Sequence, residues 1–153
     1  LSNYTVLLGQ SEIINEGQDI TIVSYGSTLR LVEKASEELE KLNISCEVID
    51  VQTLIPFDLN DLIIKSLTKT NKLLIVDEDL PGGASSYILQ KILQEKNGFE
   101  QLDSTPITLT SKNHRPAYGS DGDYFSKPSI DDIIEKAYGI MNEYDPKNYQ
   151  DLI

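Results

Sequence analysis

The chain has 153 residues, of which 39% are hydrophobic and 25% charged, and 13 basic against 25 acidic side chains give a net charge of −12. This length predicts one domain with enough chain to bury a hydrophobic core. The acidic balance argues against nucleic acid as a main partner, because phosphate binding needs a basic face, and against an anionic membrane surface. It suits a basic protein partner, although many soluble proteins are acidic.

Two further features bear on the compartment. Cys46 is the single cysteine and lies in an apolar run, so we expect a small buried hydrophobe in a reducing compartment. No stretch approaches the roughly 20 apolar residues of a membrane span, and no signal peptide is visible. We therefore expect a cytoplasmic protein. The chain begins with Leu1 and its one methionine is Met141, which predicts a processed chain or a piece of a longer polypeptide.

The first half of the chain alternates strand and helix patterns. Residues 9–17 predict a short edge strand, and the β-rich run 19–26 ends in glycine. A helix is predicted over 27–43, with Ser27 as its cap, although Ser27 and Thr28 at a helix start also suit an anion. Its apolar face comprises Leu29, Val32, Ala35, Leu39 and Leu42.

The same alternation continues to the end. Strands are predicted at 45–51, 72–78 and 106–111. Asp58 is the expected cap of the second helix, and the third helix, over 84–98, is expected to end at Gly98. Ser129 is expected to cap the last helix, over 129–144. The inward-facing residues expected on these helices are Leu59, Leu62, Ile63, Leu67, Ile88, Leu89, Ile92, Leu93, Ile130, Ile133, Ile134, Ala137 and Met141.

This pattern predicts an α/β domain whose mostly parallel sheet is covered on both faces. Ligand sites in such sheets lie at the carboxyl ends of the strands. A dinucleotide-binding turn needs three glycines in the pattern G-x-G-x-x-G, and the end of the first strand has only Gly26. The sequence therefore does not support dinucleotide binding. The end of the third strand has Asp77, Glu78 and Asp79, with Lys112 after the next strand, as in a phosphoryl-accepting receiver domain. That reading lacks carboxylates after the first strand to hold Mg²⁺.

Residues 113–128 contain the densest set of candidate groups. His114 and Arg115 could act on an anionic substrate, although a lone histidine in a glycine-rich loop is more often a surface residue. Asp121 and Asp123 fail the calcium-loop pattern, because Tyr124 and Phe125 follow where further ligands are required. We expect these two aromatic side chains to tuck under the sheet before the last helix. The residues alone predict no complete active site.

Four motifs in order resemble the C-terminal domain of transketolase-like, thiamine-diphosphate-dependent enzymes. The resemblance is greatest to the β subunit of 2-oxo acid dehydrogenases, the pyruvate and branched-chain types included. The residues at family positions are Leu8, Gly9, Glu16, Gly17, Asp19, Gly26, Asp50, Leu54, Pro56, Asp58, Glu78, Gly82 and Gly83. The fourth motif, over 124–137, resembles the family's entry to its final helix. Residues 113–124 resemble instead the version in bacterial chains that fuse the α and β parts.

The resemblance implies a three-layer α/β/α domain over 1–153, with a mixed sheet of about five strands, one antiparallel edge strand, a linker at 1–8 and a tail at 145–153. It implies no catalytic, cofactor or metal residues here; thiamine diphosphate and Mg²⁺ would bind other domains of the full-length dehydrogenase. This domain would serve in assembly, through like domains and other domains of the same enzyme, and in docking the subunit-binding domain of the acyltransferase. The candidate interface residues are Glu78, Gly82, Gly83, His114, Arg115, Tyr124 and Phe125. A transketolase or deoxyxylulose-phosphate synthase domain remains an alternative.

Overall fold

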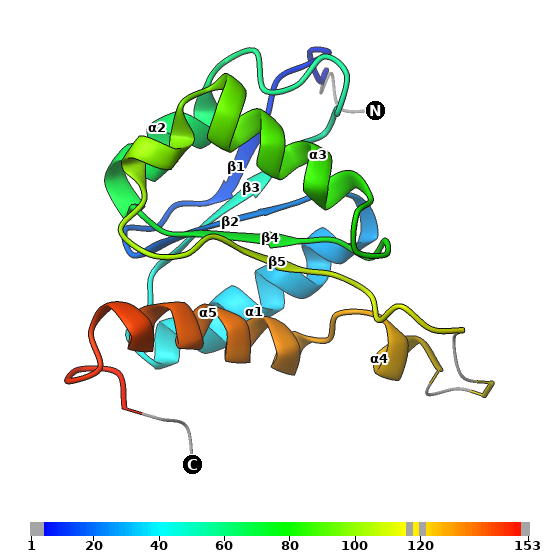
Figure 1. Ribbon diagram of the computed structural model, residues 1–153, viewed down its shortest axis with the longest axis vertical. Coiled ribbons are helices and arrows are strands. Elements are labelled where there is room, and N and C mark those ends of the chain that lie inside the picture. The colour runs from blue at the N-terminus through cyan, green and yellow to red at the C-terminus, as the bar shows by residue number, and fades with distance from the viewer. Residues whose placement is uncertain (1–4, 116–117, 120–121, 151–153) are drawn as a thin grey trace.

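The computed structural model describes residues 5–115, 118–119 and 122–150, and within them one five-stranded sheet has the order β1-β3-β2-β4-β5 (Figure 1). Strands β2 (Ile20–Ser24), β3 (Cys46–Asp50), β4 (Leu73–Val76) and β5 (Ile107–Leu109) are parallel to their neighbours in this order. The edge strand β1 (Glu12–Asn15) is antiparallel to β3. The mixed sheet with one antiparallel edge strand was predicted.

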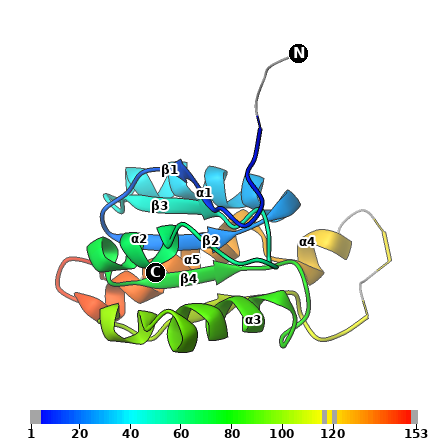
Figure 2. The same cartoon turned by 90° about the horizontal axis from the view of Figure 1, so that it is seen from above.

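Helices cover both faces of the sheet, as Figures 1 and 2 show. Helices α1 (Leu29–Lys41) and α5 (Ile130–Tyr144) pack on one face, and α2 (Leu62–Thr70) and α3 (Ala84–Gln90) on the other. A π-helical turn (Lys91–Glu95) continues α3, and the short α4 (Gly122–Ser126) precedes α5. The predicted three-layer α/β/α architecture is confirmed.

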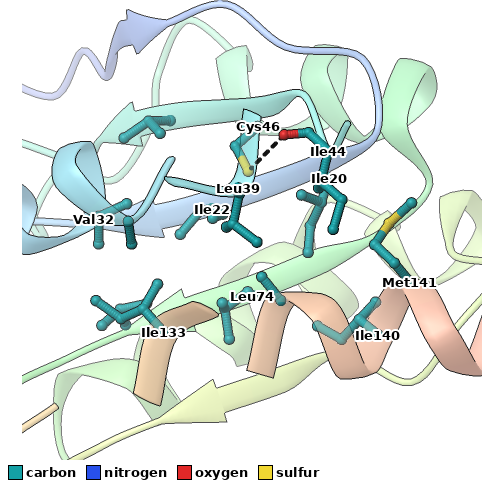
Figure 3. Packing of buried hydrophobic residues seen from close by; sticks show 14 residues of the cluster. Ile20, Ile22, Val32, Leu39, Ile44, Cys46, Leu74, Ile133, Ile140 and Met141 are labelled. Atoms are coloured by element: carbon teal, nitrogen blue, oxygen red, sulfur yellow. Dashed lines mark hydrogen bonds between the residues drawn. The ribbon is translucent and has the colours of Figure 1, made fainter. Parts of the chain in front are cut away.

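The core on the α1 and α5 face is drawn in Figure 3. Ile22 and Leu74 from the sheet meet Leu39 of α1 and Ile133 of α5, and all four side chains are fully buried. Periodicity explains the contact, since apolar residues three or four apart share one helical face and alternate residues share one sheet face. At about 25 cal/mol per Å² of apolar surface, this burial is the main force that holds the helices to the sheet.

The core on the α2 and α3 face contains one polar cluster. The Thr21 hydroxyl lies 2.6 Å from the hydroxyls of both Ser66 and Thr70, and all three side chains are buried. Each hydroxyl therefore has a partner, which removes the cost of burying an unpaired polar group. These contacts fix α2 to β2.

The structure corrects three local predictions, for Ser27, Leu59 and Gly98, and bears out the predicted cap at Asp58. Ser27 lies within a 3-10 turn (Gly26–Thr28), and neither that turn nor α1 has a side-chain cap, so the predicted Ser27 cap is wrong. Asp58 does accept bonds from the amides of Leu62 and Ile63, and thus caps α2 from before its first turn. Leu59 in this irregular turn is 63% exposed rather than inward. Asn97, not Gly98, holds the left-handed conformation after the π-helical turn.

The last helix begins as predicted. Ser129 accepts a bond from the Asp132 amide at 3.2 Å, and the Asp132 carboxylate accepts one from the Ser129 amide at 2.9 Å. This reciprocal pair is a capping box. Beyond the helix, Tyr149 of the predicted tail packs edge-on against Tyr138 at 5.9 Å between ring centroids. Within the described ranges, no helix is both long and apolar enough to cross a bilayer.

Candidate functional site

The carboxyl ends of the parallel strands meet at one edge of the sheet, where Asp77 follows β4. Its carboxylate accepts hydrogen bonds from the Tyr25 hydroxyl at 2.6 Å, the Asp79 amide at 3.0 Å and the Ser85 amide at 2.8 Å. Asp77 is fully buried. Burial, followed by the bond to Asp77, raises the pKa of Tyr25 far above its ordinary value. The cluster therefore links β2, β4 and the start of α3.

This geometry argues against the receiver reading. A phosphoryl-accepting aspartate must present an oxygen to solvent and to Mg²⁺, whereas both Asp77 oxygens accept bonds inside the protein. Among the described residues, no group of three or more His, Cys, Asp or Glu side chains is arranged to hold a metal ion. Asp77 thus has a structural role.

The turn after β4 carries three of the predicted interface residues. Gly82 has a φ of +94°, which side-chain-bearing residues rarely adopt. A Cβ on Gly83 would lie 2.3 Å from the Asp79 carboxylate. Both family glycines therefore have conformational or steric reasons for their place. The exposed Glu78 carboxylate accepts a bond from Lys127 at 3.3 Å.

Lys112 and His114 meet Phe125 beside this turn. The Lys112 ammonium lies 3.9 Å from the centre of the Phe125 ring, and the His114 ring lies 5.5 Å from it at a tilt of 42°. The Lys112 amide also donates to the Ser126 carbonyl at 2.9 Å. These contacts join the end of β5 to α4, so the structure brings His114 and Phe125 together.

The other two predicted residues of this segment lie further out. The Arg115 guanidinium donates to the Tyr118 hydroxyl and lies over the Tyr118 ring. Tyr124 donates to the Asp131 carboxylate at 2.9 Å. Asp121 and the side chain of Asp123 lie outside the described residues.

The predicted burial of Tyr124 and Phe125 under the sheet is wrong, because they are 65% and 56% exposed. Helix α4, which no sequence pattern indicated, holds both rings on the surface. Among the described residues at this edge, His114 has an exposed ring whose Nδ1 lies 2.8 Å from the Arg115 carbonyl oxygen. Among the side chains that the structure describes, no serine, cysteine or carboxylate is in bonding contact with His114 to form a nucleophile–base pair.

Sequence reasoning missed Tyr25 and Lys127. Tyr25 falls within the predicted β-rich run 19–26, and its contact with Asp77 joins residues far apart in the chain. Lys127 lies in the stretch 113–128 but is not among the candidate groups predicted there, and its ammonium donates to the Glu78 carboxylate at 3.3 Å. Neither residue belongs to a periodic pattern, so only the fold reveals these contacts.

The opposite end of the sheet explains another family motif. The Gly17 amide donates to the buried Glu47 carboxylate at 3.2 Å, and Lys69 pairs with the same carboxylate. Burial alone raises the pKa of Glu47, but the bonds from Lys69, Ser66 and Gly17 outweigh it and lower that pKa. This region is structural.

Cys46 lies in β3 as predicted, inside the core, with its Sγ 3.8 Å from the Ile44 carbonyl oxygen (Figure 3). Burial, and then the nearby acidic charges of Asp19 and Glu40, raise the pKa of the thiol to about 12. A thiol is nucleophilic as its thiolate, so Cys46 is inert in the folded protein.

Residues 9–131 match the model of the transketolase C-terminal domain, and the chain belongs to this family. It is 36% identical, over 92% of its length and 42% of the relative's, to the pyruvate dehydrogenase E1 component subunit beta of Mesostigma viride. It is 35% identical, over 74% of its length and 32% of the relative's, to the acetoin:2,6-dichlorophenolindophenol oxidoreductase subunit beta of Bacillus subtilis. The predicted kinship with dehydrogenase β subunits is confirmed.

Among solved structures, a split gene transketolase described as an inactive beta4 tetramer has the same fold. Its TM-score is 0.74 at 20% identity, over 92% of this chain and 44% of that one. The chain thus spans less than half the length of these relatives.

Proposed function

We propose that this chain is the C-terminal domain of the thiamine-diphosphate-dependent decarboxylating component of a 2-oxo acid dehydrogenase. The observation that carries this is the 36% identity to a pyruvate dehydrogenase β subunit over 92% of the chain. The full-length protein would decarboxylate a 2-oxo acid and pass the acyl group to a lipoyl group. Its place would be the cytoplasm.

The cofactor belongs, in this proposal, to other domains of the enzyme. The described residues offer no set of carboxylates for Mg²⁺, and Asp77, the buried carboxylate at the strand ends, is already fully engaged. The diphosphate-binding motif of the family, Gly-Asp-Gly followed by an asparagine, has no counterpart at residues 120–124. This domain would therefore contribute contacts rather than chemistry.

One contact surface is the carboxyl edge, made of Glu78, Gly82, Gly83, His114, Arg115, Tyr124 and Phe125. We place contacts with like domains and with other domains of the same enzyme on the part of this edge formed by Gly82, Gly83, His114, Arg115 and Phe125. Three observations support this: the exposed Phe125 ring, the exposed Leu80 beside Gly82, and the absence of a nucleophile–base pair among the described residues here. Exposed aromatic and aliphatic groups rimmed by charges are typical of protein interfaces.

A second surface suits the acyltransferase. Glu16, Glu37 and Glu40 line a shallow hollow between the end of β1 and α1, together with Asn15, Ser36 and Ser45. No basic side chain lies in that lining. A basic subunit-binding domain would find three carboxylates there, and complementary charge mainly speeds association and selects the partner. We place docking at this hollow.

The test is binding of the full-length enzyme to the isolated subunit-binding domain of its cognate acyltransferase, by calorimetry at low and high salt. The charge reversals Glu37→Lys and Glu40→Lys together should weaken binding at least about tenfold, and added salt should weaken the unchanged enzyme similarly. The matched control reverses Glu100 and Glu143, which are exposed elsewhere. Equal affinity of both double variants would reject docking at this hollow.

A further inference from the structure

A groove crosses the surface between α1 and the segment that leads into α5. One half is a mostly apolar hollow of about 400 Å³, whose walls include Leu31, Tyr124, Pro128 and Ile130. The other half is a hollow of about 300 Å³ that continues past Leu31, Lys127 and Pro128, which line both halves. The two hollows therefore adjoin and form one groove.

The second half of the groove is basic. Arg30 and Lys34 lie one turn apart on α1, both exposed, and Lys127 faces them from the other wall. The whole chain carries 13 basic against 25 acidic residues, so three cations along one groove depart from its average. The charge of this lining therefore differs in sign from that of the chain as a whole.

The carboxylates of the groove are already engaged, whereas two of its cations are not. Glu78 accepts a bond from Lys127 at 3.3 Å, and Asp131 accepts one from Tyr124 at 2.9 Å. Arg30 and Lys34 have no carboxylate within bonding distance in the described part of the chain. An incoming carboxylate would thus meet two exposed, uncommitted cations.

We propose that this groove binds an acidic segment of a partner protein that carries one apolar anchor residue. The anchor occupies the hollow beside Tyr124 and Ile130, and the carboxylates lie along Arg30 and Lys34. The groove fits a peptide segment better than a single small anion, because an apolar hollow and a basic hollow adjoin and share Leu31, Lys127 and Pro128. Charge complementarity requires this partner segment to be acidic. The acyltransferase domain proposed for the hollow beside Glu37 is basic, so the two proposed partners differ in the sign of their charge.

The probes are fluorescein-labelled peptides of about twelve residues, each with one central Leu or Phe and about four Asp or Glu residues on one side. A second pool replaces the acidic residues with Lys, and a third keeps the acidic residues but has Ser for the anchor. Fluorescence anisotropy with the full-length protein measures binding. The anchored acidic pool should bind most tightly and should weaken as salt rises.

Variants locate the binding. Arg30→Glu with Lys34→Glu should weaken the anchored acidic pool about tenfold or more, whereas Lys65→Glu with Lys147→Glu, equal in charge, should change it less than about twofold. Tyr124→Ser should weaken the anchored acidic pool and leave the anchor-free pool unaffected. Circular dichroism confirms that each variant is folded.

Three results would overturn the proposal: no binding of the anchored acidic pool, binding that the Arg30 and Lys34 reversal does not weaken, or equal binding of the anchor-free pool. The last result would mean that the groove takes an anion only. The anisotropy assay measures peptide binding and does not depend on decarboxylation. The proposed function can therefore fail while this inference stands, and this inference can fail while the proposed function stands.

Discussion

Gly17 and Glu47 lie in direct contact, with the Gly17 amide donating to the Glu47 carboxylate at 3.2 Å. A Cβ on Gly17 would lie 2.1 Å from the Cys46 carbonyl carbon, so the turn before β2 can approach β3 this closely only without a side chain. The Glu-Gly motif that pointed to the family is thus explained by packing rather than by chemistry.

Gly17→Ala should destabilise the protein by about 3 kcal/mol, because the methyl group would overlap the β3 backbone. Gly139→Ala is the matched control, since nothing lies within 4 Å of a Cβ there and the position is inside α5. It should stabilise the protein by about 0.5–1 kcal/mol through its better helix propensity. Urea unfolding measures both, and similar effects of the two changes would contradict the steric account.

Lys69→Met should remove the partner of a buried carboxylate and cost about 3 kcal/mol at pH 7. Lys41→Met is the control, because the Lys41–Glu38 pair is exposed and contributes at most about 0.5 kcal/mol. Chemical denaturation at pH 7 compares the two variants, and a loss as small for Lys69→Met as for Lys41→Met would mean that the buried pair does not stabilise the fold.

The Lys69–Glu47 pair also predicts a pH dependence. The folded-state pKa of Glu47 is lowered, so its contribution is fully present above the unfolded value of about 4.3 and is lost as pH falls through the folded value. In Lys69→Met, burial should raise that pKa instead, and acidification should then relieve the buried charge. The stability gap between the parent and Lys69→Met should therefore narrow below about pH 5. A gap that is constant from pH 7 to pH 4 would count against this reading.

Tyr25→Phe should cost about 1–2 kcal/mol, because the buried Asp77 carboxylate loses a hydrogen-bond donor. Tyr124→Phe removes a hydroxyl that bonds to a carboxylate at the exposed surface, and it should change stability by less than about 0.5 kcal/mol. Thermal unfolding monitored by circular dichroism compares the two. If Tyr124→Phe proved the more costly, the Asp77 cluster would not be the link between the sheet edge and α3.

Cys46 should not react with a disulfide reagent at pH 8 while the protein is folded, because its thiol is buried and has a pKa raised to about 12. In denaturant the same thiol should react at the rate of a free cysteine. Absorbance of the released thiolate reports both rates. Rapid, stoichiometric labelling of the native protein would show that β3 is accessible.

The sequence predicted the layered fold because its periodic patterns are strong. Val32, Ala35 and Leu39 recur at helical spacing and are buried as expected, and the capping box of Ser129 and Asp132 begins α5 where the pattern placed it. The failures lie in short segments without a period. Leu59 continued an apparent stripe, yet the chain there makes an irregular turn and α2 begins only at Leu62.

The candidate site was less predictable for a physical reason. Tyr124 and Phe125 are apolar rings in a short segment, so burial was the natural expectation, but α4 places them on the surface beside Lys112 and Asp131. The basic groove arises because Arg30 and Lys127 come from distant parts of the chain. The net charge of −12 indicates an acidic surface on average and does not show where basic side chains gather.

The activity that we propose for the full-length protein is that of the decarboxylating component of a 2-oxo acid dehydrogenase. The most direct measurement supplies the purified, assembled enzyme with thiamine diphosphate, Mg²⁺, a lipoyl domain and either pyruvate or a branched-chain 2-oxo acid. Mass spectrometry then follows the lipoyl domain while released carbon dioxide is counted. We predict acylation of the lipoyl group in step with decarboxylation of one of these acids. Transfer of a two-carbon ketol unit between sugar phosphates, with no acylated lipoyl domain, would contradict the claim and identify a transketolase.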